Sequence, residues 1–255
     1  MATYKKRGYK PKTKAEKDVL LEDESTTAEV FKSLDEGASK TEAWMEKNQK
    51  YILGLVGVIA VCVLGYLGYQ EFVQKPKEVE ATNEMFQAQS YYDQALTSTV
   101  AKDSLFGLAL TGGAGKYGFT DIADKFGGTA AGNLATYYAG MSYLNTRKYQ
   151  EAINYLDDFK SNDEMLGPLA KGAIGDAFVQ LGQNSEALKY YEEAASMKSN
   201  EVTTPRFLLK AGVLALDMGD AAAALAHFKK IDEEFATSAE AAKAKLYLGR
   251  AEAMN

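Results

Sequence analysis

The sequence predicts an all-α protein in which a single transmembrane helix precedes an α-solenoid of about three full repeats with flanking helices. Three observations support this prediction: an uncharged apolar stretch, helical spacing of apolar residues after Pro76, and a glycine–alanine pattern that recurs from residue 133 onward. The expected parts are a tail at residues 1–50, the transmembrane helix at 51–70 and a helical domain at 71–255.

The tail carries charge of both signs. Residues 1–50 hold 11 Lys and Arg against 10 Asp and Glu, and seven of the basic residues fall in the first 17 positions. Such a segment has few residues that form a core, so residues 1–26 are expected to be mostly disordered. Thr27 is expected to cap a helix that begins near Ala28 and continues toward the apolar stretch.

The apolar stretch covers residues 51–69, and ten of these 19 residues are Leu, Ile or Val. As a helix they extend roughly 28 Å, close to the ~30 Å hydrocarbon core of a bilayer. A cleaved signal peptide would have a shorter apolar region within about the first 15–30 residues. A helix buried in a soluble core is the other alternative, but such helices rarely stay uncharged for five turns. The stretch therefore predicts a single-pass membrane anchor.

Basic residues near the two ends of the span predict its orientation. Residues 31–50 contain four lysines, whereas residues 70–89 contain two. Together with the basic first 17 residues, this asymmetry predicts a cytoplasmic N-terminus and a periplasmic C-terminal domain, with the span in the cytoplasmic (inner) membrane. The opposite orientation would make the protein a regulatory adaptor that faces the cytoplasm.

Four glycines give the span a further feature. At 100° per helical residue they fall within one arc of about 80°. Small residues on one face let a second membrane helix approach closely, so the stripe predicts a packing face for a partner helix. The alternative is that glycine is simply common in membrane helices. The four residues are Gly54, Gly57, Gly65 and Gly68.

Helical spacing resumes after Pro76, and residues 78–96 place apolar side chains on one helix face. A glycine-rich stretch follows at 107–119. A phosphate-binding loop would need Gly and Ser or Thr at two positions that hold Leu110 and Tyr117. The stretch is therefore expected to be a flexible turn between helices.

From residue 133 the chain repeats itself at intervals of 35 and 37 residues. In each copy a glycine precedes an alanine by 12 residues, and a bulky residue follows that alanine by four. Small residues allow paired helices to approach closely, bulky ones fill the space between layers, and Gly182 and Gly219 suit the turn within a pair. The three sets are Gly140, Ala152 and Leu156; Gly175, Ala187 and Tyr191; and Gly212, Ala224 and Phe228.

This pattern resembles the tetratricopeptide repeat (TPR), whose period is 34 residues. The repeats are expected near 133–160, 168–198 and 205–236, followed by a closing helix at 238–253. The closing proline of that repeat is absent from each copy.

A more specific resemblance rests on DIADKFGGTAAGNLATYYAGMSYLNTRKYQEAINYL and the later TTPRFLLKAGVLALDMGD. These segments resemble the YfgM-like family of envelope proteins, over roughly residues 45–250. The resemblance implies an ancillary subunit of the SecYEG translocon, whose periplasmic repeats work beside chaperones on emerging client polypeptides. An adaptor of another envelope assembly or secretion complex is the alternative, because repeat domains change partners easily.

A TPR array curves, and the first helix of each pair lines its concave face. The residues expected there are mostly apolar and suit a hydrophobic or amphipathic client segment. Arg206 is nearly the only cation among them, so capture of an acidic C-terminal peptide is not expected. The alternative is that several of these side chains belong to the core. The candidate partner-binding residues are Leu134, Tyr137, Met141, Asp176, Arg206, Leu209 and Val213, with Leu144, Leu169, Val179 and Leu216 on the same face.

Composition argues against several classes of function. The single cysteine, Cys62, lies in the span, and the single histidine, His227, argues against a multi-histidine metal site or a conventional catalytic triad. Residues 78–255 hold 16 Lys and Arg against 24 Asp and Glu, a balance that repels nucleic acid. We therefore expect no enzyme activity, no cofactor or metal, and no small-molecule substrate; the expected partners are proteins and the membrane.

Overall fold

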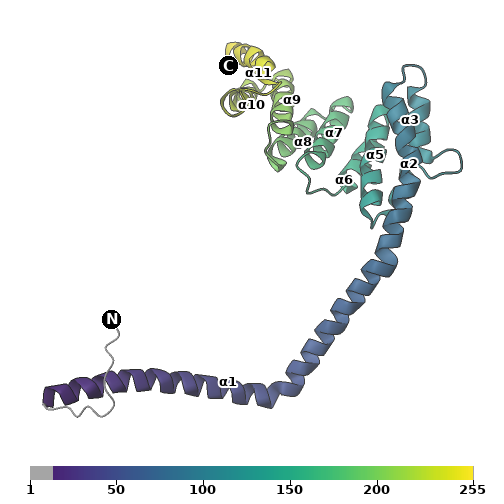
Figure 1. The fold of residues 1–255 in the computed structure, drawn as a ribbon. Coiled ribbons are helices and arrows are strands. Elements are labelled where there is room, and N and C mark those ends of the chain that lie inside the picture. Colours follow the sequence, from purple (N-terminus) through teal and green to yellow (C-terminus); the bar gives the residue numbers. More distant parts are fainter. Residues whose placement is uncertain (1–13, 255) are drawn as a thin grey trace. The chain divides into compact units, whose positions relative to one another are not determined.

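The computed structural model of the chain describes the backbone of residues 14–254 and the side chains of residues 41–254. Among these residues no strand is present, so the all-α prediction is confirmed (Figure 1). The elements are α1 (Lys14–Tyr69), the π-helical segment η1 (Gln70–Gln74), α2 (Lys75–Thr97), α3 (Lys102–Thr111), α4 (Phe119–Phe126), α5 (Ala130–Asn145), α6 (Tyr149–Asp158), α7 (Leu166–Gln180), α8 (Asn184–Met197), α9 (Thr203–Asp217), α10 (Ala221–Glu234) and α11 (Ala241–Met254).

Helix α1 begins earlier than the sequence predicted. It starts at Lys14, so the predicted start near Ala28 is wrong. Residues 14–26 contain neither glycine nor proline and are rich in Lys, Glu and Leu, which are strong helix formers. The expected disorder of residues 1–13 lies outside the described residues.

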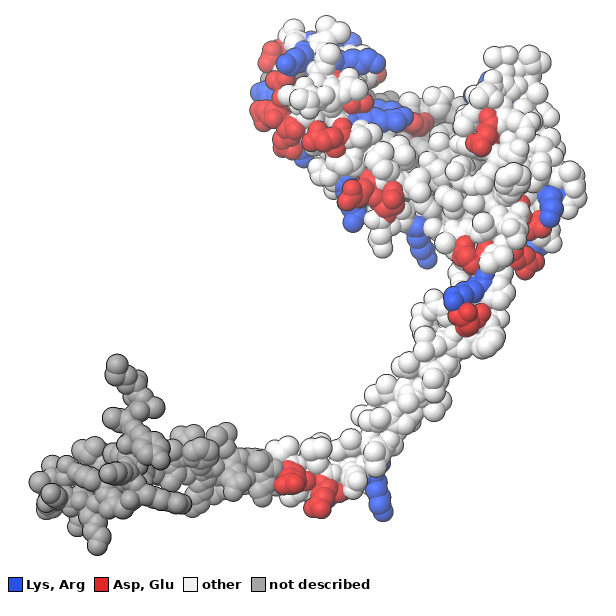
Figure 2. All heavy atoms as spheres, in the orientation of Figure 1, with Lys and Arg blue, Asp and Glu red and all other residues white. Residues whose placement is uncertain are grey.

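The apolar span lies in the second half of α1. Helices α1, η1 and α2 follow one another without a break, and their continuous helical segment Thr41–Thr97 contains one window of residues that is long and apolar enough to cross a membrane. None of that window is buried inside the protein, unlike the core helix of a soluble domain. Figure 2 shows this part of α1 as a stretch without acidic or basic side chains.

The chain from Gln70 onward forms a second unit built of consecutive helix pairs. Helices α5 and α6, α7 and α8, and α9 and α10 pack as pairs, and each pair contacts the next (Figure 1). Contacts between α5 and α7, and between α7 and α9, bring the first helices of successive pairs side by side. This is the stacking expected of a TPR-like solenoid. Helix α11 packs on α10 and α9, while α2, α3 and α4 pack around α5.

The repeating small and bulky residues lie where the paired helices cross. A Cβ atom at Gly140 would come within 2.5 Å of Leu156, and one at Gly175 within 2.6 Å of Tyr191. At Gly212 a Cβ atom would overlap the ring of Phe228. The three alanines of the pattern are fully buried, so the close approach predicted from the spacing is confirmed: these are Ala152, Ala187 and Ala224.

The prediction for the glycine-rich stretch at 107–119 is wrong in part, because its first residues are helical. It was expected to be a flexible turn from residue 107, but α3 continues to Thr111 and buries Phe106 and Leu110. The turn itself covers residues 112–118, and Gly112 adopts a φ of 86° there. A Cβ atom on Gly118 would overlap the carbonyl of Leu110, so close backbone packing explains this glycine. The aromatic residues of α2–α5 hold the segment in place, because Phe119 stacks on Tyr138 with centroids 5.2 Å apart.

The turn within each repeat has the same geometry. Gly182 and Gly219 adopt φ values of 73° and 83°, which end α7 and α9 in left-handed conformations. In the first repeat this position is occupied by Arg147, with a φ of 62°. A side chain in this conformation costs about 1–2 kcal/mol, a cost that glycine avoids.

Replacing Arg147 with glycine is therefore expected to stabilise the domain by about 0.5–1 kcal/mol, after allowing for the greater entropy of glycine in the unfolded chain. Thermal unfolding of the full chain in detergent measures the shift. Gly182→Ala is the matched control and should destabilise the domain, because it introduces the same strain. If Arg147→Gly lowered the melting temperature, the strain argument would be wrong.

A carboxylate joins the helix that follows the span to the repeats. Glu78 of α2 accepts hydrogen bonds from the backbone N–H groups of Ala130 and Ala131, at 2.7 and 2.8 Å. One turn earlier, Gln74 donates to the carbonyl oxygen of Gly128 at 2.6 Å. Two of the free N–H groups at the start of α5 are thus satisfied by an anion, which the helix dipole also favours.

Glu78→Ala is expected to lower the free energy of unfolding by about 0.5–2 kcal/mol, as for loss of an N-cap. Glu80→Ala, an exposed position on the same helix, is the control and should change stability little. Chemical unfolding of both variants compares the two effects. Equal effects at the two positions would show that the contact with α5 contributes nothing to stability.

Candidate protein-binding surface

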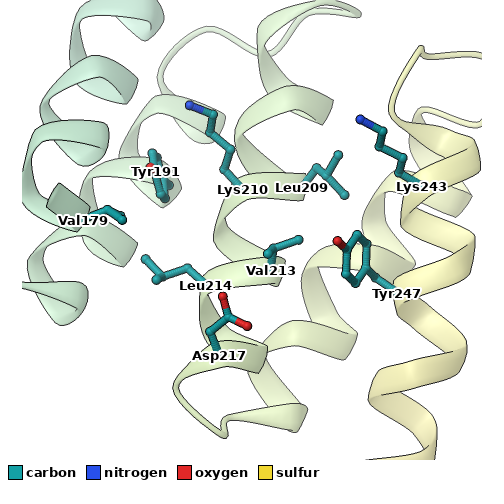
Figure 3. Close-up of a pocket in the computed structure, with 9 residues that line it drawn as sticks. All are labelled: Val179, Tyr191, Leu209, Lys210, Val213, Leu214, Asp217, Lys243 and Tyr247. Atoms are coloured by element: carbon teal, nitrogen blue, oxygen red, sulfur yellow. The ribbon is translucent and has the colours of Figure 1, made fainter. Parts of the chain in front are cut away.

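A pocket of about 340 Å³ opens between α7, α9 and α11 (Figure 3). Its apolar lining comes from four aliphatic side chains, while Tyr191 of α8 and Tyr247 of α11 add aromatic surface. A cavity of this size and lining suits one or two bulky apolar side chains of a partner rather than a whole folded surface. The aliphatic residues are Val179, Leu209, Val213 and Leu214.

Three residues placed on the concave face by the sequence meet in this pocket. Leu209 and Val213 lie one turn apart on α9, and Val179 faces them from α7 (Figure 3). All three are partly buried and pack against the core of α8–α11. They retain apolar surface toward the pocket because α7, α9 and α11 leave a space in front of them.

Asp176 fixes the positions of Lys210 and Tyr191, which line one side of the pocket. Its carboxylate accepts hydrogen bonds from Lys210 Nζ at 2.5 and 2.7 Å and from the Tyr191 hydroxyl at 2.6 Å. Burial raises the pKa of Tyr191 far above its ordinary value, and the Asp176 charge and hydrogen bond raise it further. The phenol therefore stays protonated and acts as a donor. The Asp176 carboxylate thus already binds Tyr191 and Lys210, and these contacts connect α7, α8 and α9.

The remaining charged residues of the pocket are free. Among residues 41–254, Lys243 of α11 and Asp217 of α9 make no hydrogen bond or ion pair. Figure 3 shows Lys210 and Lys243 at one end of the pocket and Asp217 at the other. The pocket thus has an apolar middle, a free cation at one end and a free anion at the opposite end.

The other predicted partner-binding residues lie outside this pocket. Leu134 and Met141 are partly buried and pack against the neighbouring cores. Tyr137 is only 8% exposed and its ring contacts Tyr138 and Phe159, so this side chain belongs to the core. Arg206 is exposed and lies over the ring of Phe207, 5.9 Å from its centroid.

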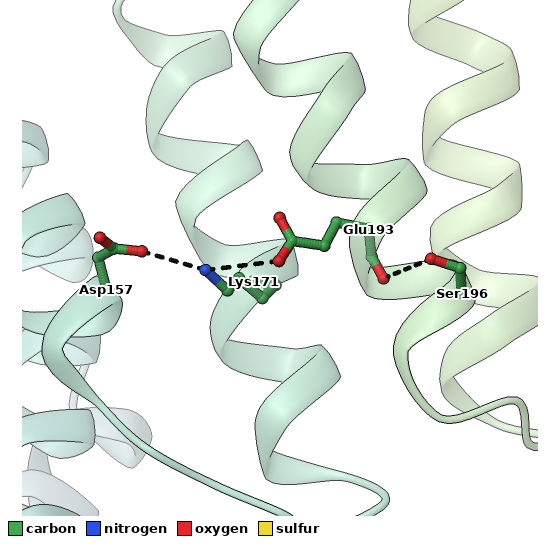
Figure 4. Close-up of polar contacts among 4 residues, drawn as sticks. All are labelled: Asp157, Lys171, Glu193 and Ser196. Atoms are coloured by element: carbon green, nitrogen blue, oxygen red, sulfur yellow. Dashed lines mark hydrogen bonds and ion pairs between the residues drawn. The ribbon is translucent and has the colours of Figure 1, made fainter.

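A charged network joins α6, α7 and α8 (Figure 4). Lys171 of α7 bridges Asp157 of α6, at 3.1 Å, and Glu193 of α8, at 3.6 Å. Desolvation alone would lower the pKa of Lys171, but the hydrogen bond to Asp157 and the charges of both carboxylates outweigh it, so the pKa is raised. The network joins two successive pairs across their boundary.

Among the residues whose side chains are described, none lies next to the glycine stripe of the span. A Cβ atom at any of its four positions would meet nothing within 4 Å, so each position is open: Gly54, Gly57, Gly65 and Gly68. In the part of the chain whose side chains are described, no group of three or more His, Cys, Asp or Glu residues could hold a metal ion.

Sequence reasoning missed six residues of the pocket: Tyr191, Lys210, Leu214, Asp217, Lys243 and Tyr247. Lys210 and Asp217 follow Leu209 and Val213 by one and four positions, so their place on the first helix of the third pair was available from the sequence. Lys243 and Tyr247 were not, because α11 was interpreted only as a closing helix. Because α11 packs on α9, the face of α11 that carries Lys243 and Tyr247 lines the pocket.

The comparisons with known proteins identify one family. Residues 74–246, more than half of the 255-residue chain, match the model described as "T7SS, ESX-1 secretion system protein EccA1, N-terminal domain". The match begins at the end of η1, includes nearly all of the helical unit and covers every pocket residue except Tyr247. No curated protein matches the chain.

Proposed function

The chain belongs to the family of the EccA1 N-terminal domain, and on this premise we propose that it is a membrane-anchored TPR-like adaptor of a protein-export machine. In this proposal the helical unit binds segments of protein partners, and the apolar part of α1 holds it at the membrane. The protein performs no catalysis, and its partners are polypeptides rather than nucleic acids or small molecules.

One observation carries the proposal: the apolar pocket on the first helices of the second and third pairs. Val179, Leu209 and Val213 expose apolar surface that no part of the described chain covers. The Asp176–Lys210–Tyr191 contacts keep the pocket open in a fixed shape, so little order must be gained on binding. A preformed, largely apolar cavity with a few placed polar groups is the usual form of a ligand site, and apolar anchor side chains of bound peptides fill hydrophobic grooves in the same way.

The machine that we propose is the SecYEG translocon, with periplasmic chaperones and emerging client polypeptides as partners. The resemblance to the YfgM-like family supports this choice. The protein would lie in the cytoplasmic (inner) membrane with its helical unit in the periplasm, as the lysine distribution indicates. The glycine stripe, open along α1, would pack on a translocon helix.

A second candidate is an adaptor of another secretion complex. The family match favours this alternative, because the protein named by the family model belongs to the ESX-1 secretion system. A regulatory adaptor that faces the cytoplasm is the third candidate and requires the opposite orientation. Protease treatment of spheroplasts and of lysed cells separates the third from the others, since only a cytoplasmic domain is protected until lysis.

Site-specific photo-crosslinking tests the binding function. With a photoreactive residue at Val213, cells that export protein should yield crosslinks between the chain and other polypeptides. The matched control is Ala226, an exposed residue of α10 that does not line the pocket. Equal crosslinking at both positions, or none at Val213, would refute binding in the pocket.

Affinity purification from membranes then identifies the machine. Recovery of SecYEG subunits supports the translocon, whereas recovery of another secretion complex without SecYEG supports the second candidate. Gly57→Leu together with Gly65→Leu should release a partner that packs on the stripe. Undiminished recovery with this variant would contradict packing through the glycines.

A further inference from the structure

Lys243 and Asp217, at the two ends of the pocket, differ from the other lysines and aspartates of α7, α9 and α11, all of which form ion pairs. Lys171 and Lys210 each bind a carboxylate on a neighbouring helix, and Lys245 of α11 pairs with Asp232 at 3.3 Å. Lys243 and Asp217 have no such partner in the described part of the chain, although both border an apolar cavity. Their charges are thus available to a bound molecule.

From this arrangement we infer that the pocket selects a polypeptide segment in which apolar side chains lie between an acidic and a basic residue. The acidic residue pairs with Lys243 and the basic one with Asp217, while the apolar side chains contact Val179, Leu209 and Val213. The inference rests on the proposed adaptor function and names the class of segment that the adaptor accepts.

Charge complementarity distinguishes this segment from other apolar ones. Lys210 adds little net charge to its end of the pocket, because Asp176 neutralises it through two hydrogen bonds. One free positive and one free negative charge therefore remain, at opposite ends (Figure 3). A segment flanked only by acidic residues places one of them against Asp217, and a segment flanked only by basic residues places one against Lys243. Like charges brought together in this way oppose binding.

The orientation of the bound chain follows the order of its charges. A segment with the acidic residue first enters with its N-terminal end toward Lys243, and one with the basic residue first enters the other way. In both orientations the acidic residue pairs with Lys243 and the basic residue pairs with Asp217. Selection therefore acts on the presence of both charges and less on their order, which suits an adaptor that meets many sequences.

Three labelled peptides with the same leucine-rich centre test the inference by fluorescence polarisation. One has an acidic and a basic end, one has two acidic ends and one has two basic ends. The full chain in non-ionic detergent is used, and binding to Val213→Glu in the same detergent is subtracted to remove peptide held by the micelle. The mixed peptide should bind roughly three- to tenfold more tightly than either uniform one, as for two exposed ion pairs.

Charge reversal at each end should change the preference in a specific direction. Asp217→Lys should favour the peptide with two acidic ends, and Lys243→Glu the peptide with two basic ends. Lys245→Glu reverses a charge on the same helix outside the pocket and should leave the order of preference unchanged. All three sites are on the surface, so the variants are expected to fold, and circular dichroism checks this.

The outcomes separate the inference from the proposed function. If all three peptides bind equally to the unmodified chain, and Val213→Glu abolishes binding, the pocket binds polypeptides without charge selection and the inference is wrong. If Val213→Glu binds all peptides as well as the unmodified chain does, the pocket is not a binding site and the proposed function fails as well. A preference that weakens as salt rises to about 1 M supports the inference, because the Debye length is then about 3 Å.

Discussion

Truncation of Phe228 to alanine is expected to lower the free energy of unfolding of the helical unit by about 3–5 kcal/mol. The ring is fully buried between α9, α10 and α11. It covers the position of Gly212 and stacks on Tyr247, with ring centroids 5.7 Å apart. Its removal leaves a cavity that no one helix can fill without losing contacts on its other side.

Urea unfolding of the full chain in non-ionic detergent, followed by brief proteolysis at each urea concentration, measures this loss. Lys229→Ala changes the exposed neighbour of Phe228 on α10 and should alter stability by less than about 0.5 kcal/mol. Because Tyr247 also lines the pocket, the Phe228 variant should bind peptides more weakly at temperatures where it is still folded. A stability loss below about 1 kcal/mol would contradict tight packing at this crossing.

Replacement of Gly172 by alanine is expected to destabilise the unit by about 1–3 kcal/mol, although alanine favours a helix more than glycine does. A Cβ atom at this position would overlap the ring of Phe207 on α9. That ring is 2% exposed and stacks on Tyr191, so it cannot move aside without disturbing the wall of the pocket. The added methyl group therefore pushes α7 and α9 apart.

Gly249→Ala is the matched control for this prediction. Gly249 also lies within a helix, α11, but a Cβ atom there meets nothing within 4 Å. The control should stabilise the chain by about 0.5–1 kcal/mol, as expected for alanine in place of glycine inside a helix. The two substitutions are chemically identical and should act with opposite signs in the same unfolding measurement. Stabilisation by both would show that α7 and α9 are not in close contact at Gly172.

Much of the fold could be predicted because its causes are local or periodic. The span follows from an unbroken run of apolar residues. The helix pairs follow from spacing that places Gly175 against the ring of Tyr191 and Gly212 against the ring of Phe228. Helix α3 was missed because its sequence ends in a glycine-rich stretch. The burial of Phe106 and Leu110 against α2 and α5 outweighs that local signal.

The candidate site was only partly predictable, for a different reason. Leu209 and Val213 follow from the position of α9 in its repeat, whereas Lys243 and Tyr247 enter the pocket only because α11 packs beside α9. Tyr137 occupies the position equivalent to the pocket-lining Leu209 of the third repeat, yet Phe159 covers its ring. Spacing alone does not reveal which member of a periodic set a neighbouring segment covers.

The contact made by Glu78 has a mechanical consequence. Two attachments one turn apart, from Gln74 to Gly128 and from Glu78 to the start of α5, prevent α2 from swivelling against the first repeat. A hinge requires a segment that rotates freely, and these two attachments leave none at this junction. Tension on a polypeptide held by the repeats would therefore be transmitted to α2 as a torque. Helix α2 would turn together with the first repeat, because the junction between them does not bend freely.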